Sequence, residues 1–138
     1  MVIGVGLGTP ADAEFECFGE DRPDRVRARK LGEALTVLEG LWSGATFNHD
    51  GEFFDIDRVK FVPQAVQSPH VPIWVAGFWP NKPPMHRAAR WDGVFPLKMP
   101  PVPLPGAAPR STLWLQPHEL GGAAKYVSQQ RSNSGQLV

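Results

Sequence analysis

The sequence is poor in several features that mark specialised classes of protein. It has one cysteine, Cys17, so an internal disulfide is excluded. Its 14 basic residues balance 14 acidic residues, and no segment gathers enough of one sign to predict a nucleic-acid or membrane-binding surface. The longest nearly apolar run, residues 71–79, is about half as long as a membrane-spanning helix. Residues 1–9 lack the basic start and apolar core of a secretory signal, so we expect a cytoplasmic protein.

Metal chemistry is also poorly supported by the sequence. The four histidines are scattered without the spacing of metal ligands, and no metal site is predicted. What the chain does hold is 14 glycines and 15 prolines in 138 residues, below the share typical of disorder. This composition indicates one folded, loop-rich domain. The balanced charge favours a small organic molecule as its partner.

Residues 72–97 are the most informative segment. A continuous apolar run at residues 73–76 predicts a strand covered on both faces, as in parallel sheets. A polar turn at residues 77–82, a helix over about 84–91 and a second strand at 94–97 follow. This order predicts a parallel β/α fold, in which ligands collect at the carboxyl ends of the strands. The turn at residues 77–82 is therefore the first candidate site.

The first half of the chain predicts three further elements. Near the start, branched apolar residues alternate with Gly4, Gly6 and Gly8, which gives a strand with one bare face, suited to close packing or to a flat ligand. A helix capped by Asp21 or Asp24 is expected to run to residues 43–44. Its apolar stripe steps by four, three and four residues: Leu31, Leu35, Leu38 and Trp42. Residues 46–54 predict a hairpin turning at positions 50–51, with extended chain at 59–62.

The remaining segments are less distinctive. Residues 100–109 hold five prolines and predict an exposed connector, and residues 117–131 predict a helix. A basic cluster at Arg25, Arg27, Arg29 and Lys30 is interpreted as a solvated helix turn rather than an anion site. Cys17 is expected to be a small buried hydrophobic residue.

Several blocks together resemble the bacterial luciferase-like family of flavin-dependent and deazaflavin-dependent oxidoreductases. They span about residues 2–131, and their order and spacing are more specific than any one block. The blocks are residues 3–8, 14–15 with 18–19, 31–44, Phe47 with Gly51 and Phe53, 67–77, 87–93 and, more weakly, 115–131.

The resemblance implies an α/β fold of the (β/α)8 TIM-barrel type that binds FMN or the deazaflavin coenzyme F-420. Such an enzyme transfers a hydride or activates oxygen on a small-molecule substrate. Because a whole barrel needs about 250 residues, the chain is expected to be an incomplete barrel, with about strands 4 to 6, their helices and a small β-hairpin excursion. We expect one partial domain, with a core over 1–98, a connector over 99–112 and a late helix over 113–138.

The resemblance also assigns the site residues. It places the cofactor phosphate at the turn that follows the strand at 73–76, and the glycines near the start of the chain are added as cofactor-binding positions. The predicted cofactor-binding residues are Gly77, Phe78, Trp79, Asn81, Lys82, Gly6 and Gly8. Gly77 admits close backbone approach to an anion, and Lys82 supplies a full positive charge beside a helix start. No catalytic residue is carried over, so the chain as it stands is expected to be inactive or weakly active.

Two other hypotheses remain open at this stage. In the first, the chain is a non-catalytic binding or assembly module that completes itself through open sheet edges, by pairing with another copy as a homo-oligomer or with another chain. In the second, it is a degenerate or truncated gene product without a function of its own.

Overall fold

The computed structural model describes residues 1–8, 11–98 and 115–134. The chain divides into two compact units, which we describe separately. The first consists of Gly6–Val71 with Met1, and the second of Val2–Val5 with Pro72–Val138. The predicted connector at residues 99–112 lies outside the described residues, and the predicted division of the domain stays a prediction. Among the described residues, no helix has both the length and the apolarity that crossing a membrane requires.

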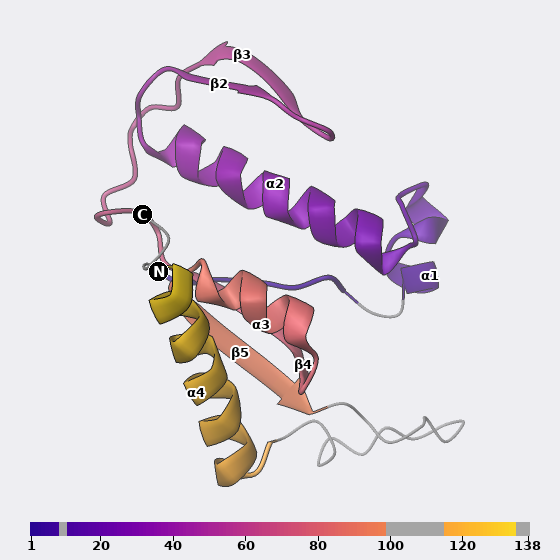
Figure 1. The fold of residues 1–138 in the computed structure, drawn as a ribbon. Helices are drawn as coiled ribbons and strands as arrows, with labels where there is room; N and C mark the ends of the chain where they lie inside the picture. Colours follow the sequence, from indigo (N-terminus) through magenta and orange to yellow (C-terminus); the bar gives the residue numbers. More distant parts are fainter. Residues whose placement is uncertain (9–10, 99–114, 135–138) are drawn as a thin grey trace. The chain divides into compact units, whose positions relative to one another are not determined.

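The first unit is built around the long helix α2, Asp24–Trp42 (Figure 1). It follows two short elements, α1 at Ala11–Glu14 and the 3-10 helix η1 at Glu16–Phe18. The predicted end is confirmed, because the chain leaves the helix at Ser43 and Gly44 has a positive φ of 71°. The predicted cap is wrong. Pro23 occupies the cap position, and Asp24 is the first helical residue, where its carboxylate pairs with a guanidinium one turn on.

A two-stranded antiparallel hairpin completes this unit. Its strands are β2 at Phe47–Asp50 and β3 at Asp55–Val59. The hairpin is confirmed, but its second arm starts later than predicted. Residues 51–54 form the turn, since Gly51 donates its N–H to the Phe54 carbonyl at 3.0 Å and the N–H groups of residues 52–54 donate to a carboxylate of α2. Residues 60–62, predicted to be extended, lie beyond the end of β3 and form no strand.

The second unit contains a three-stranded parallel sheet. Its strands are β1 at Ile3–Val5, β4 at Ile73–Trp79 and β5 at Gly93–Lys98, in the order β1-β4-β5. Asp92 fixes the entrance of the central strand, because Ile73 donates its backbone N–H to Oδ2 of Asp92 at 2.8 Å and accepts the Asp92 N–H at 3.1 Å. The predicted strand-helix-strand unit is therefore confirmed as part of a mixed α/β fold with a parallel sheet.

Two helices lie against this sheet, α3 at Lys82–Ala89 and α4 at Pro117–Ser134 (Figure 1). The core between them and the sheet is fully apolar: Ile73, Val75, Met85, Ala88, Ala123 and Val127. Arg131 of α4 holds the carboxyl end of α3 by donating hydrogen bonds to the carbonyls of Ala88 at 3.3 Å and Trp91 at 2.5 Å. Carbonyls at the carboxyl end of a helix carry the negative end of the helix dipole, so a cation there is favourable.

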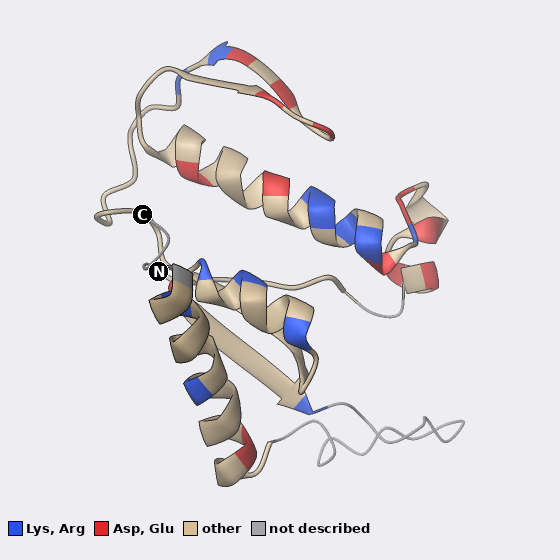
Figure 2. Ribbon diagram, viewed as in Figure 1, with Lys and Arg blue, Asp and Glu red and all other residues tan. Residues whose placement is uncertain are grey.

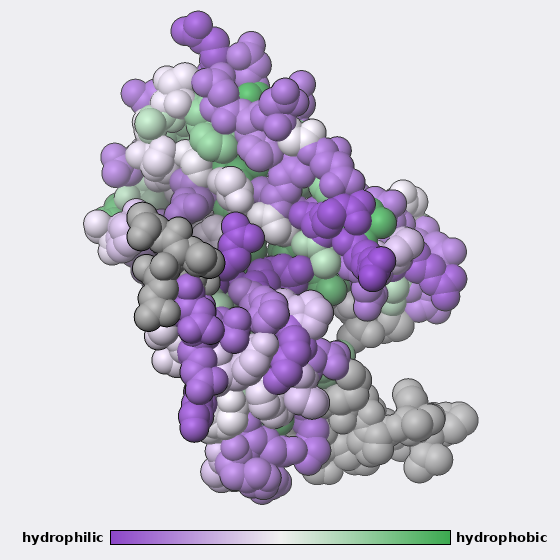
Figure 3. Space-filling view, in the orientation of Figure 1, coloured by the Kyte–Doolittle hydropathy of each residue, from purple (hydrophilic) through white to green (hydrophobic). Residues whose placement is uncertain are grey.

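In the described part of this unit, neither α3 nor α4 packs on the opposite face of the sheet. Side chains alternate along β4, so Trp74 lies on the face opposite to Ile73 and Val75. Trp74 is 44% exposed, and Phe95, on the same face of the neighbouring strand, is 48% exposed. Elsewhere, on the face drawn in Figure 3, hydrophilic residues predominate and apolar residues show as small separate patches.

Two expectations about single side chains are wrong. Cys17 is exposed, because it lies on the short η1 helix, which has no buried residue, and its thiol donates to the Ala13 carbonyl at 2.8 Å. Arg27 is not solvated with the rest of its basic cluster. It is 7% exposed and donates from Nη1 to the carbonyl of Leu7 at 2.7 Å.

Candidate functional site

The candidate site lies at the carboxyl end of the central strand. The sequence predicted a turn over residues 77–82, but the strand continues to Trp79, because β5 pairs with it along its whole length up to Lys98. The turn is reduced to Pro80 and Asn81, and Asn81 closes it by donating its N–H to the Phe78 carbonyl at 3.0 Å. Three of the predicted cofactor residues therefore lie on a strand, and only two belong to the turn and the helix start.

Gly77 has a packing reason for lacking a side chain. A Cβ atom at this position would lie 2.2 Å from Cβ and 2.7 Å from Cγ of Pro84, which belongs to α3. Real Cβ atoms do not approach other heavy atoms so closely. The glycine therefore allows α3 to lie directly on β4, whether or not a ligand is bound.

Lys82 lies in a cluster of aromatic side chains. Its Nζ is 3.9 Å from the ring centre of Tyr126 and 4.8 Å from that of Trp79. His86 joins the same cluster, with Nε2 at 2.6 Å from the Tyr126 hydroxyl and its ring stacked on the Tyr126 ring. Of the predicted residues, the structure thus brings Trp79 and Lys82 into contact with each other, and both contact a tyrosine of α4.

Sequence reasoning missed His86 and Tyr126. His86 could have been found, because it lies four residues after Lys82 and therefore on the same face of a helix. Tyr126 could not, since nothing in the order of residues indicates that α4 packs beside this turn.

The donors available to an anion at this turn are limited. The first N–H groups of a helix have no partner within the helix and can bind an anion. In α3, however, Pro83 and Pro84 occupy the first turn and have no N–H group. Asn81 is exposed, and its side chain does not cap α3. An anion at this end of α3 would therefore depend on the Lys82 ammonium more than on backbone donors.

The two early glycines belong to the first unit. Gly8 has a positive φ of 72°, and a Cβ atom there would lie 2.5 Å from the Phe15 ring. A glycine is therefore needed at position 8, because the backbone has a positive φ and the Phe15 ring leaves no room for a side chain. Gly6 follows β1 and lines a hollow with Leu7 and Arg27.

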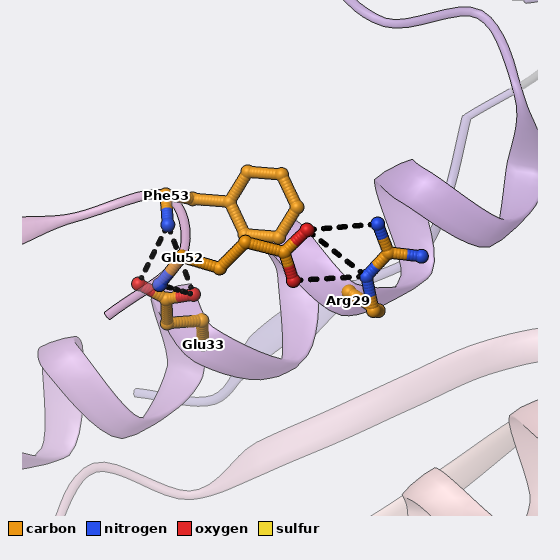
Figure 4. Close-up of polar contacts among 4 residues, drawn as sticks. All are labelled: Arg29, Glu33, Glu52 and Phe53. Atoms are coloured by element: carbon orange, nitrogen blue, oxygen red, sulfur yellow. Dashed lines mark hydrogen bonds and ion pairs between the residues drawn. The ribbon is translucent and has the colours of Figure 1, made fainter.

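A second polar constellation joins α2 to the hairpin turn (Figure 4). Glu33 accepts hydrogen bonds from the backbone N–H groups of Glu52, Phe53 and Phe54, the shortest at 2.8 Å, and lies 3.1 Å from Nε2 of His49. Partial burial opposes ionisation, but the hydrogen bonds from Phe54, Phe53 and His49 outweigh it and hold the pKa of Glu33 below its usual value. This constellation orients the hairpin.

An exposed ion pair lies beside it. Arg29 binds both carboxylate oxygens of Glu52, at 2.8 and 2.9 Å, and this hydrogen bond lowers the pKa of Glu52. Both side chains are about half exposed, so the pair adds little stability. Figure 2 shows the basic residues in the first half of α2 and acidic residues along the hairpin. The described part of the chain contains no cluster of three or more histidine, cysteine or acidic side chains that could hold a metal ion.

Comparison with known proteins decides the family. Residues 1–101 match the model of the luciferase-like monooxygenases. The chain belongs to the luciferase-like monooxygenase family. The assignment predicted from the order of the sequence blocks is thus confirmed.

Curated relatives support the assignment. An uncharacterized protein of Mycobacterium tuberculosis is 35% identical over 92 residues, which cover 66% of this chain and 30% of that protein. Its counterpart in Mycobacterium bovis matches equally. The oxygenase component of the flavin-dependent trigonelline monooxygenase of Acinetobacter baylyi is 38% identical over 79 residues, which cover 57% of this chain and 21% of the relative. The chain thus spans about a third or less of the curated relatives that it matches.

Proposed function

We propose that this luciferase-like chain is part of a flavin- or deazaflavin-dependent oxidoreductase with a (β/α)8 barrel, and that the end of β4 holds the phosphate of the cofactor. The observation that carries the proposal is the parallel sheet β1-β4-β5, whose helices α3 and α4 pack on one face while the other face is apolar and open.

The open face favours a barrel over a doubly wound sheet. A doubly wound sheet has helices on both faces, whereas the strands of a barrel have helices outside and one another inside. Trp74 and Phe95 are large apolar residues on the uncovered face, as interior residues of a barrel would be. The strands correspond to about the fourth to the sixth of such a barrel.

The turn after β4 has the charge that a phosphate requires. Lys82 is exposed at the start of α3, and Asn81 presents a carboxamide beside it. Phe78 lies on the open face by the alternation of the strand, where an aromatic side chain suits the flat ring of a flavin. We assign Lys82 and Asn81 to the phosphate and Phe78 to the cofactor's wall, while Gly77 and Trp79 support them by packing.

The chemistry would come from the cofactor. When bound, a flavin or deazaflavin supplies hydride transfer or, for a flavin, oxygen activation. The residues of this turn bind and orient the cofactor's tail, and the substrate is a small molecule. The remaining predicted positions, Gly6 and Gly8, stay proposals for the same cofactor.

The phosphate assignment is tested by comparing FMN with riboflavin, which lacks the phosphate. Fluorescence titration of the full chain should show FMN binding about tenfold more tightly than riboflavin, because a hydrogen-bonded charge pair contributes about 1.5 kcal/mol. Lys82→Met should remove this preference. Lys125→Met, at an exposed position on α4, is the matched control and should retain it.

Equal affinity for FMN and riboflavin in the unmodified chain would refute the phosphate site. If Lys82→Met and Lys125→Met both lose the preference for FMN over riboflavin, the preference comes from the net charge of the protein rather than from Lys82. A parallel titration with coenzyme F-420 decides between the two cofactors.

A second function is favoured by the edges of the sheet. Within the described ranges of the chain, β1 and β5 have one sheet neighbour each, and exposed strand edges pair readily with other chains. The alternative is therefore an assembly module that associates with a second copy of itself. Light scattering after size exclusion would show a dimer in that case, and a monomer would count against it. A fragment without function would show no slowly exchanging amides in β4.

A further inference from the structure

The first unit contains a hollow of about 250 Å³ that the proposed phosphate site does not use. Its walls come from the segment after β1, from the residues that flank η1, from α2 and from the hairpin turn. Most of the lining is apolar: Leu7, Phe15, Leu31, Ala34 and Phe54. Gly6, the two cations Arg27 and Lys30, and one carboxylate, Glu20, complete it.

Arg27 is the unusual member of this lining. Its side chain is only 7% exposed, although it carries a full charge. Nη1 donates to the Leu7 carbonyl, Nη2 pairs with Asp24, and the guanidinium lies 4.5 Å from the centre of the Phe15 ring. Among the residues that the structure describes, none offers its buried Nε a hydrogen-bond acceptor. A buried donor without a partner is costly, so this position favours a ligand that brings an acceptor.

The charges around the hollow leave Arg27 incompletely neutralised. Lys30 pairs with Glu20, so these two lining charges balance each other. Asp24, the carboxylate that faces Arg27, is 81% exposed and therefore largely solvated. An occupant with one negative charge and an apolar body would match both the uncompensated cation and the apolar walls.

The volume limits the size of that body. Pockets for drug-sized molecules occupy about 300–1,000 Å³, and this hollow is smaller. We propose that it binds a small organic monoanion with a single ring, such as an aromatic carboxylate, whose carboxylate accepts from Arg27 while its ring packs against Phe15 and Phe54. The site is formed within the first unit and does not depend on a bound flavin.

Benzoate is the probe, and the full chain is titrated with it by NMR and calorimetry. We expect saturable binding with nuclear Overhauser contacts between the benzoate ring and the methyl groups of Leu7 and Leu31. Benzyl alcohol, which keeps the ring and lacks the charge, should bind at least about tenfold more weakly.

Two variants and one control locate the binding. Arg27→Met removes the charge and should weaken benzoate binding by about tenfold or more. Because that variant also leaves the Leu7 carbonyl without its donor, Ala34→Leu serves as the second variant, filling the hollow while leaving Arg27 intact. Arg25→Met, an exposed position on the same helix, should change the affinity less than about twofold.

The proposal is overturned if benzoate binding does not saturate or if benzyl alcohol binds equally well. It is also overturned if Ala34→Leu, shown by circular dichroism to be folded, binds benzoate as the unmodified chain does. Equal weakening by Arg25→Met would show that general positive charge attracts the probe and would refute a specific role of Arg27.

Discussion

Substitution of Gly77 by alanine distinguishes packing from ligand approach as the reason for this glycine. Where nothing packs on a glycine in a strand, replacing it by alanine stabilises the folded state by about 0.5–1 kcal/mol, because alanine loses less backbone entropy on folding. Here the new Cβ would lie 2.2 Å from Cβ of Pro84, so α3 must move away from β4. Forced overpacking of this kind costs about 1–3 kcal/mol. We therefore expect Gly77→Ala to lower the free energy of unfolding by about 1 kcal/mol, within a range of about 0–2.5 kcal/mol, once the entropy gain is subtracted.

A double-mutant cycle isolates the contact. Pro84→Gly removes both atoms that the new Cβ would meet, at its own cost in helix stability. Urea unfolding of the two single variants and the double variant should show the double variant more stable than the sum predicts, by about 1 kcal/mol or more. Additive losses, or a stabilised Gly77→Ala variant, would refute the packing explanation and leave ligand approach as the reason for the glycine.

Three further changes test other contacts. Gly40→Ala should destabilise the first unit by about 1–3 kcal/mol in urea, since its Cβ would lie 2.0 Å from the Phe47 ring; an unchanged midpoint would contradict this. For Glu33 the folded-state pKa lies below the usual 4.5, so its stabilisation is complete above that value and is lost as the pH falls below it. Glu33→Gln should therefore be less stable at pH 7, and the difference should shrink on acidification; a constant difference would disprove the linkage. Arg131→Met should speed amide exchange in α4, because losing the hydrogen bonds to Ala88 and Trp91 lowers the free energy of unfolding by about 1 kcal/mol. Lys125→Met should leave exchange unchanged.

The sequence predicted the elements of the second unit better than their ends. The continuous apolar run from Ile73 predicts a strand covered on both faces. The parallel pairing with β1 and β5 agrees, but the cover on both faces is wrong, because Trp74 is 44% exposed. The sequence predicted a strand that stops at Ala76 and a polar turn over residues 77–82. The strand continues to Trp79, because pairing with β5 and packing of Pro84 outweigh the local preference of glycine.

The candidate site was predicted less well, since its partners come from distant segments. The burial of Arg27 depends on the Leu7 carbonyl, 20 residues earlier, and on the Phe15 ring. The surroundings of Lys82 depend on Tyr126, 44 positions later, in a helix that the pattern predicts but does not place. Helical spacing shows which side chains share a face, but it does not show what that face meets.

The position of Lys82 on the rings of Tyr126 and Trp79 has a consequence for cofactor affinity. A cation–π contact at an exposed site contributes about 0.5–1 kcal/mol, and an ammonium that turns toward a phosphate gives this up. Removing one ring should therefore strengthen FMN binding by about two- to fivefold. Tyr126→Leu keeps an apolar residue on α4 and is the variant to titrate, with riboflavin as the control ligand, whose affinity should not change. Weaker FMN binding by Tyr126→Leu would instead show that the rings hold the ammonium where the phosphate needs it.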